Sequence, residues 1–480
     1  MISEFVRKQK RYTQKDLEGI LHASEESVVP IIRKLKEFNV LKAVRASDMQ
    51  KDLSDLVDAD VEVADVEAGE NDYLYVFTFV GVIVVAGRVL KCYPKYLLHV
   101  EEPKEQLRQV LKVLEKYSSK EQIIRMYNDS SESSAFNLLA VLLFLLHDYY
   151  NNGVYSNTED IIESNGSGEI LWDKTINETF TLIAGNRPYY VDLQTRKRVR
   201  DEYDYFQRLH ECILTRASKE LVEAQLLDIF EITEVDITDE TLDDFGEDEY
   251  ILYRIEKELN TQFNTRKQLV LKTIYAYIDH SGSLYDTDCL SMFGTNSFNL
   301  VWEGICADIL DNQLETRIDQ LKLPVPLKPE YSGIKKNTLK ELIEKPMWSA
   351  TGKRAADTLI PDLIAIYRQD FIIFDAKYYN ATLEMGTIPK GQPGIESVTK
   401  QYLYQLAYQK FICDHGFTSV KNCFLMPTEN KEVEDKGDVS MEMLSDLGLQ
   451  DIQVRNLPAN MAFEHYLSGR KMDLSLLQLK

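Results

Sequence analysis

The sequence predicts a multi-domain α/β protein, and three observations support this. The chain has 480 residues, more than one hydrophobic core usually organises. Hydrophobic residues make up 44% of it, enough to bury sizeable cores. Runs of β-branched and aromatic residues alternate with segments of helical periodicity. We therefore expect mixed sheets flanked by helices, together with a helical middle region.

Residues 1–47 predict a small helical module. Thr13 is a good N-cap for a helix over 14–21, and a second helix is expected over 24–38, before a strand at 40–44. This order resembles a winged helix, whose second helix would face DNA. Three basic side chains would make that contact: Arg33, Lys34 and Lys36. A protein-binding winged helix and a plain helical cap fit the pattern equally well.

Beyond this module, charge and periodicity divide the chain. Residues 48–72 predict an acidic linker, because residues 52–72 carry nine Asp and Glu and no Lys or Arg. Residues 73–200 mix strand and helix patterns and predict one mixed domain. Residues 201–285 predict two long helices around an acidic run, forming a strut. Residues 286–480 carry the informative chemistry.

The usage of cysteine and histidine limits the metal chemistry. The six cysteines form no close pair and the seven histidines no ligand cluster, which disfavours zinc. A catalytic metal would have oxygen ligands, which favours Mg²⁺ or else Mn²⁺. The chain has no GxxxxGK[ST] phosphate loop, so it is not expected to bind a nucleotide. Without a long apolar run or a signal region, we expect a cytoplasmic protein with no membrane contact.

The net charge of −23 at first argues against a polyanionic partner. Phosphate binding depends on local positive surface, however, and the charges are segregated. Residues 1–45 carry ten Lys and Arg against six Asp and Glu, and residues 333–354 carry six against two. In the second segment, Lys353 and Arg354 are expected to contact phosphates, and Trp348 to be a core residue. This distribution is compatible with DNA binding.

The C-terminal segment predicts a β-hairpin on which charged side chains converge. Strands are expected over 359–367 and 371–378, separated by a short turn. Because strand side chains alternate between faces, Asp375 and Lys377 share one face. Asp362 lies at the start of the first strand, which the hairpin brings near the end of the second. Two carboxylates and an ammonium therefore converge at one end of the hairpin.

Such a set suits phosphodiester hydrolysis. Carboxylates hold a divalent cation that neutralises the scissile phosphate and activates a water, and a lysine can polarise that water. A helix over 297–310 precedes the hairpin and carries Glu303. A later helix presents three polar side chains on one face: Gln401, Gln405 and Tyr408. The nearest other acids, Asp357 and Asp370, are interpreted as loop residues.

This arrangement resembles the PD-(D/E)xK nuclease superfamily. The matching residues are Pro361-Asp362, twelve intervening residues, and Asp375-Ala376-Lys377. The resemblance and the chemistry together assign Mg²⁺ ligation to Glu303, Asp362, Asp375 and the backbone carbonyl of Ala376. Lys377 would position or activate the attacking water. Gln405, and with it Gln401 and Tyr408, would contact the DNA backbone or orient the site.

Four short blocks sharpen the resemblance. In chain order they are Tyr93-Pro94-Lys95-Tyr96, Gly168-Glu169-Ile170-Leu171-Trp172, Phe298 to Glu303, and Lys400 to Tyr408. They look like the LlaJI family of restriction endonucleases, which is similar to McrC, the nuclease subunit of McrBC-type systems. The resemblance implies a Mg²⁺-dependent deoxyribonuclease of a type II/IV-like antiviral defence system. It also implies double-stranded DNA as substrate and a McrB-like AAA+ GTPase as partner.

Two other functions stay open from the sequence. A repair or recombination nuclease attached to a helicase would degrade DNA processively from its ends. A non-catalytic winged-helix regulator would bind DNA without residues 286–480 and would cleave nothing. The spacing of motifs does not encode the recognition sequence, the methylation preference, the formation of a homodimer or a strict need for GTP hydrolysis.

Overall fold

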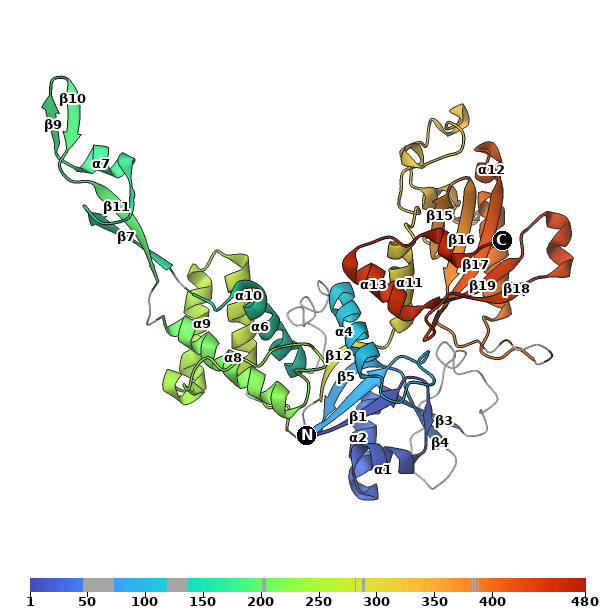
Figure 1. Ribbon diagram of the computed structural model, residues 1–480, viewed down its shortest axis with the longest axis horizontal. Helices are drawn as coiled ribbons and strands as arrows, with labels where there is room; N and C mark the ends of the chain where they lie inside the picture. The colour runs from blue at the N-terminus through green and yellow to red at the C-terminus, as the bar shows by residue number, and fades with distance from the viewer. Residues whose placement is uncertain are drawn as a thin grey trace. The chain divides into compact units, whose positions relative to one another are not determined.

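The computed structural model describes residues 1–45, 73–118, 137–156, 158–200, 204–280, 282–286, 290–381, 383, 386 and 388–480. The chain forms two compact units. One comprises Met1 and Ser133–Ser291, and the other comprises Ile2–Glu132 and Met292–Lys480. We call them the inserted unit and the main unit, because the chain leaves the second to form the first and then returns (Figure 1).

The described residues in the first part of the main unit form two sheets and three helices. Its elements here are β1 (Ile2–Arg7), β2 (Arg11–Tyr12), α1 (Gln14–Leu21), α2 (Glu25–Glu37), β3 (Leu41–Arg45), β4 (Tyr73–Phe77), β5 (Val80–Val85), β6 (Arg88–Tyr93), α4 (Lys104–Ser118) and β12 (Leu290–Thr295). One sheet has the order β1-β6-β5-β12 and the other β2-β4-β3. The two helices and the strand expected in the N-terminal segment are therefore present.

The predicted boundary at residue 47 does not isolate a module. β1 runs parallel to β6, with Ile2 opposite Arg88 and Arg7 opposite Tyr93. β3 pairs with β4 in an antiparallel ladder. The structure therefore joins the N-terminal residues to the next sheet, where the sequence predicts a separate domain. The predicted linker over 48–72 lies outside the described residues.

The predicted domain over 73–200 also divides differently. α4 belongs to the main unit, whereas the following described helix belongs to the inserted unit. The inserted unit contains α6 (Leu138–Asn152), β7 (Thr158–Ser164), β8 (Glu169–Ile170), α7 (Trp172–Glu178), β9 (Thr181–Ala184), β10 (Arg187–Tyr190), β11 (Gln194–Arg200), α8 (Tyr205–Glu223), α9 (Asp248–Thr261) and α10 (Thr265–Asp279). The expected strut is thus three helices rather than two, and it packs with α6.

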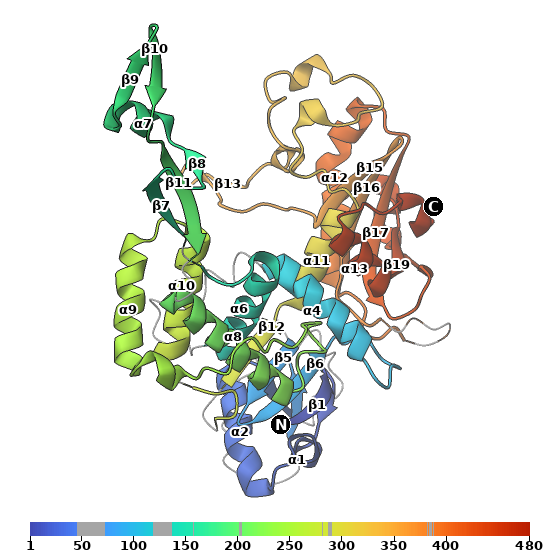
Figure 2. The ribbon, with the colours of Figure 1, turned by 60° about the vertical axis from the view of Figure 1, so that its left-hand side comes forward.

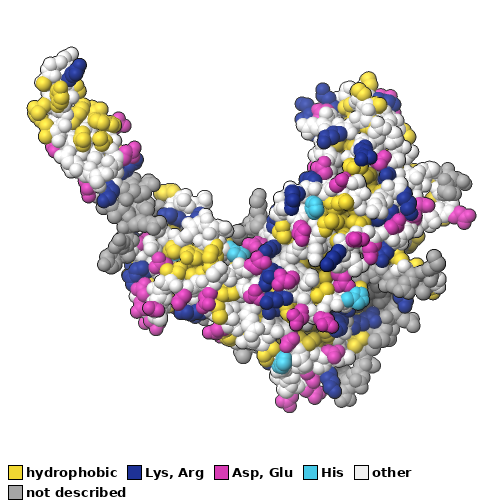
Figure 3. Space-filling view, viewed as in Figure 1, with side chains coloured by type: hydrophobic (Ala, Val, Ile, Leu, Met, Phe, Trp, Pro, Cys, Tyr) yellow, Lys and Arg dark blue, Asp and Glu magenta, His cyan; other side chains and the backbone are white. Residues whose placement is uncertain are grey.

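The inserted unit also carries a slender arm formed by β7–β11 and α7. Hydrophobic side chains gather on its surface (Figure 3), and Phe180 and Ile183 are about three-quarters exposed. The helices, by contrast, bury their apolar faces against one another, and six leucines of α6 are buried. Among the described residues, no helix combines the length and the hydrophobicity needed to cross a bilayer.

β12 approaches β5 closely at two glycines. Gly81 has φ 139° and Gly294 has φ 153°. A Cβ on Gly81 would lie 2.1 Å from the carbonyl oxygen of Phe293, and one on Gly294 would lie 2.1 Å from that of Val80. Only glycine permits this approach. The strand by which the chain returns from the inserted unit is thereby fixed to the main unit's sheet.

The rest of the main unit is a five-stranded mixed sheet with helices. Its elements are α11 (Phe298–Ile309), β13 (Met347–Trp348), β14 (Lys353–Arg354), β15 (Leu363–Tyr367), β16 (Asp370–Ala376), α12 (Ile395–Asp414), β17 (Ser419–Thr428), β18 (Glu434–Val439), β19 (Ile452–Pro458) and α13 (Ala459–Ser468). The sheet order is β15-β16-β17-β19-β18, in which β17 is parallel to both its neighbours. The predicted helix, hairpin and later helix are all present.

Candidate active site

The hairpin of β15 and β16 places two aspartates at its open end. Leu363 pairs with Phe374, so Asp362, just before β15, lies across from the end of β16. The backbone N–H of Ala376 donates to Oδ2 of Asp362 over 2.8 Å. Asp375 is buried, with only 4% of its surface exposed. The convergence expected from strand alternation is therefore present.

Lys377 completes this group. Its Nζ lies 3.0 Å from Oδ1 of Asp375. Its backbone N–H donates to the carbonyl of Leu425, which ties the end of the hairpin to β17. Burial alone would lower the pKa of Lys377, but the charge of Asp375 and its hydrogen bond outweigh burial and raise it. The side chain therefore remains an ammonium at neutral pH.

Glu303 approaches the same group from α11. Burial and the charge of Asp375 raise the pKa of Glu303, while Lys377 opposes the shift. The pKa of Asp362 lies well above its usual range, first because of burial and then because of its hydrogen bond with Asp375 and the charges nearby. Carboxylates held this close favour either a shared proton or a bound cation.

The arrangement can be tested against a divalent cation. Within the described ranges, no three or more His, Cys, Asp or Glu side chains are grouped so that they could together hold a metal ion. Mg²⁺ does not need such a group, because it keeps several waters and binds through one or two carboxylates plus substrate phosphate. Asp362, whose pKa is raised by burial and by Asp375, fits such an ion together with Asp375, and Glu303 adds negative charge beside the two.

Asn312 holds the first strand in place, and we did not anticipate it from the sequence. Its Oδ1 accepts from the backbone N–H of Ile364 over 3.1 Å, and its Nδ2 donates to the carbonyl of Asp362 over 3.5 Å. Gln313 adds a backbone bond to Ile364 over 2.8 Å. The chain after α11 thus fixes the strand beside Asp362. An asparagine just past a helix is too common for sequence to single it out.

The three polar residues of α12 are buried, which corrects one of our predictions. Gln401 donates from Nε2 to the carbonyl of Ile373 over 2.9 Å, and the Tyr408 hydroxyl donates to the carbonyl of Leu339 over 3.3 Å. Gln405 is 1% exposed. These side chains share a face as expected, but the face packs on the sheet. They have no surface to offer to DNA.

The Oε1 atom of Gln405 accepts from Nδ2 of Asn422 over 2.7 Å and from the backbone N–H of Gln450 over 3.0 Å. Gln405 therefore connects α12 to β17 and to the segment before β19. Tyr404 on the same helix lies close enough to the aspartates that their charges add to burial in raising its pKa. The sequence pattern did not single out Tyr404.

The remaining basic candidates are at the surface. Lys353 and Arg354 are exposed on β14. Trp348, expected in the core, is 64% exposed on β13, so that expectation is wrong. Arg33 is exposed on α2, and Lys34 and Lys36 are partly exposed, while the apolar face of α2 packs inward.

The other acids near the hairpin have structural surroundings. Asp370 pairs with Lys421 over 3.0 Å and accepts from the Ser419 hydroxyl over 2.7 Å. Asp357 is exposed in the segment before β15. Neither belongs to the carboxylate group. Asp357 lies outside the strands, as expected, whereas Asp370 is the first residue of β16, so its interpretation as a loop residue is wrong.

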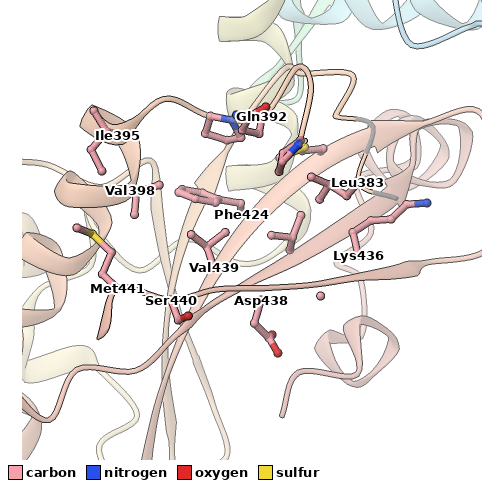
Figure 4. A pocket seen from close by; sticks show the side chains of 15 residues that line it. Leu383, Gln392, Ile395, Val398, Phe424, Lys436, Asp438, Val439, Ser440 and Met441 are labelled. Atoms are coloured by element: carbon pink, nitrogen blue, oxygen red, sulfur yellow. The ribbon is translucent and has the colours of Figure 1, made fainter. Parts of the chain in front are cut away.

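A cavity of about 580 Å³ lies beside the start of α12 (Figure 4). Its wall includes Ile395, Val398, Phe424 and Val439, with Lys436 among the few charged side chains. Phe424 is the register partner of Asp375 on β17, so the cavity lies near β16. None of the carboxylates described above lines it, so it is separate from the candidate active site.

The chain resembles known restriction proteins. The sequence profile of the LlaJI restriction endonuclease family matches residues 79–459. A relative from Bacillus subtilis, the type II restriction enzyme BsuMI component YdjA, is 26% identical over 407 residues, which are 82% of this chain and 81% of the relative.

Two solved structures from Thermococcus gammatolerans also match. One is a half-complex of McrB AAA+ hexamers with bound McrC, with TM-score 0.36, 11% identity and coverage of 97% of this chain and 99% of that one. The other is the McrBC complex, with TM-score 0.26, 14% identity and coverage of 63% and 84%. These TM-scores are too low for the likeness to carry an argument. The family profile spans most of the chain, and on that ground the chain belongs to the LlaJI restriction endonuclease family.

Proposed function

We propose that this chain is the metal-dependent DNA endonuclease subunit of a restriction system that acts against phage DNA, with a PD-(D/E)xK-like active centre. The observation that carries the proposal is the buried group at the open end of the β15–β16 hairpin. Asp375 and Lys377 are 3.0 Å apart, and Asp362 accepts from the backbone next to Asp375. Family membership supports the nuclease class.

The geometry supports the following roles. Asp362 and Asp375 would hold the cation, Mg²⁺ or Mn²⁺, with Glu303 contributing negative charge and ligation through a water. When bound, the cation supplies neutralisation of the phosphate charge and a lowered pKa for a bound water. The Lys377 ammonium, held by Asp375, would orient the attacking water or stabilise charge on the phosphorane. The Ala376 carbonyl remains a candidate ligand, because the hydrogen bond from the Ala376 N–H to Asp362 holds this residue beside the carboxylates.

We further propose that cleavage depends on a separate AAA+ GTPase, as the sequence resemblance implies. The relative in Bacillus subtilis is named as one component of a restriction enzyme, which fits a divided system. The chain's own sequence has no phosphate loop. The proposed substrate is double-stranded DNA.

The proposal can be tested with plasmid DNA. The full chain, with the GTPase encoded beside it and GTP, should cut plasmid in Mg²⁺ and stop in EDTA. Asp375→Asn and Lys377→Met should each reduce the cleavage rate at least about 100-fold, because each removes a group that acts on the transition state. Asp357→Asn is the matched control, since it changes an exposed acid in the segment leading to the same hairpin.

Cleavage that persists in Asp375→Asn would exclude this site, and cleavage in EDTA would exclude the metal mechanism. Exonucleolytic degradation from DNA ends would favour a repair nuclease instead. DNA binding with no cleavage under any condition would favour a regulator.

A further inference from the structure

The β13–β14 hairpin is a built protrusion with exposed aromatic and apolar side chains. Trp348 is 64% exposed and Met347 is 58% exposed. Within the described part of the chain, no aromatic ring packs on Trp348. A large apolar pair at the tip of a hairpin is costly to leave in water unless something binds it.

Hydrogen bonds fix the shape of this hairpin. The N–H of Ala355 donates to the carbonyl of Pro346 over 2.8 Å, and the Thr358 hydroxyl donates to the carbonyl of Glu344 over 2.7 Å. The N–H of Thr351 donates to the carbonyl of Trp348 over 3.1 Å, which closes the turn. The tip is therefore held in a defined conformation in solvent.

The base of the hairpin is anchored in a core that it shares with β15 and β16. Leu339 and Ile343, which precede the hairpin, belong to the same buried cluster as Ile364 and Phe371 of β15 and β16. After the hairpin, the chain leads directly to Asp362. Figure 2 shows β13 on a segment that extends away from the five-stranded sheet.

The charge of this segment indicates the partner. Lys335, Lys345 and Lys353 are exposed, and none of them makes an ion pair with another described residue. Arg354 lies 3.5 Å from Glu344, which is itself highly exposed, so that pair is weak. Cations around an aromatic tip match the phosphate–base–phosphate pattern of a nucleic acid.

We propose that this hairpin is a DNA-binding element that grips the duplex beside the scissile phosphate. Lys345, Lys353 and Arg354 neutralise backbone phosphates, and Trp348 with Met347 inserts against the bases in a groove. Such contacts are sequence-independent, so the hairpin supplies affinity and register rather than recognition. This inference rests on the proposed function, because it takes DNA as the substrate.

The test measures binding without cleavage. The full chain is titrated into a fluorescently labelled duplex in EDTA, and Kd is measured by anisotropy over a series of salt concentrations. Trp348→Ala should weaken binding about tenfold, within the roughly 5- to 150-fold range of a lost base–aromatic contact, with an unchanged salt slope. Trp348→Phe should restore most of the affinity. Lys353→Ala should weaken binding and reduce the salt slope by about 1.

Trp172→Ala is the matched control, because Trp172 is 53% exposed but lies in the inserted unit. Its Kd should equal that of the unaltered chain. If Trp348→Ala binds as tightly as the unaltered chain, the hairpin proposal is wrong while the nuclease proposal stands. If that variant binds duplex DNA normally but loses GTPase-dependent cleavage, the hairpin binds a protein partner and the DNA-binding proposal is wrong. An unaltered chain with no affinity for duplex DNA would overturn both.

Discussion

Lys8 shows how a single buried charge affects the main unit. Its Nζ donates to the carbonyl of Asn296 over 2.7 Å, and its side chain is 5% exposed. Burial, and then the charge of Lys95, lower the pKa of Lys8 to about 7. Between pH 7 and the normal lysine pKa, the unfolded chain binds a proton that the folded chain does not. The free energy of unfolding therefore rises with pH in this window.

The substitution Lys8→Met should remove this dependence. The gain in melting temperature of the variant over the unaltered chain should be larger at pH 6.5 than at pH 9.5. Each kcal/mol of destabilisation by the buried charge that the substitution removes should raise the melting temperature by about 2–4 °C. Differential scanning fluorimetry at the two pH values measures this. Lys15→Met, at an exposed site on α1, is the control: its melting temperature should differ from that of the unaltered chain by the same amount at both pH values. A pH-independent effect of Lys8→Met would contradict the buried-charge interpretation.

A substitution at Gln405 can distinguish a structural role of this residue from a role in DNA contact. Gln405→Leu removes the acceptor of the Gln450 N–H and of one Asn422 amide bond. An unsatisfied buried donor costs about 1–3 kcal/mol, so the free energy of unfolding should fall by that amount. Denaturant titration gives the loss, and Leu406→Ala, on the exposed face, is the control. A variant of unchanged stability with weakened DNA binding would restore the original interpretation.

At the scale of elements, the β15–β16 hairpin depends on the segment that follows α11. Asn312 binds the backbone of Ile364 and Asp362. Asn312→Ala should therefore displace Asp362 and reduce cleavage about 10- to 100-fold, as is typical for residues that orient metal ligands. The neighbouring substitution Gln313→Ala is a control, because that side chain binds only Asp311 among described residues.

Raising the Mg²⁺ concentration should partly rescue Asn312→Ala, because the weakened step is cation binding. Equal activity of the Asn312 and Gln313 variants, measured as the initial rate of plasmid cleavage, would show that Asn312 does not position the site.

Local patterns predicted the hairpin and its charged residues, and the reason is physical. Alternation over β16 puts Asp375 and Lys377 on one face whatever surrounds the strand. Helical periodicity likewise grouped Gln401, Gln405 and Tyr408, but periodicity does not say which face the sheet covers. The prediction that Trp348 is a core residue was wrong for a related reason. Whether an aromatic residue is buried depends on where its hairpin projects, which two short strands do not reveal.

At the scale of the whole molecule, the sequence could not show which segments fold together. β1 pairs with β6, more than eighty residues later in the chain. The main unit resumes only after the inserted unit is complete. Such long-range pairings leave no local signature, so the predicted boundaries followed composition instead.

The inserted unit should fold by itself. A fragment spanning residues 137–286 contains the buried helical core of α6, α8 and α10. It should show a helical circular dichroism spectrum and a cooperative thermal transition, and it should not cleave DNA. Non-cooperative melting of the fragment would indicate that the unit depends on the main unit. The exposed apolar side chains of the arm predict self-association at high concentration, which light scattering would detect.

The close approach at Gly81 and Gly294 has a mechanical consequence. Two chain segments connect the inserted unit to the main unit, so a pulling force on the inserted unit is transmitted through both segments. One of these segments enters β12, whose backbone lies directly against that of β5 at Gly81 and Gly294. Strands held side by side in a sheet resist shear through many hydrogen bonds that must break together. A load arriving at the inserted unit would therefore be borne by the sheet of β1, β6 and β5 before it reached α11 and Glu303.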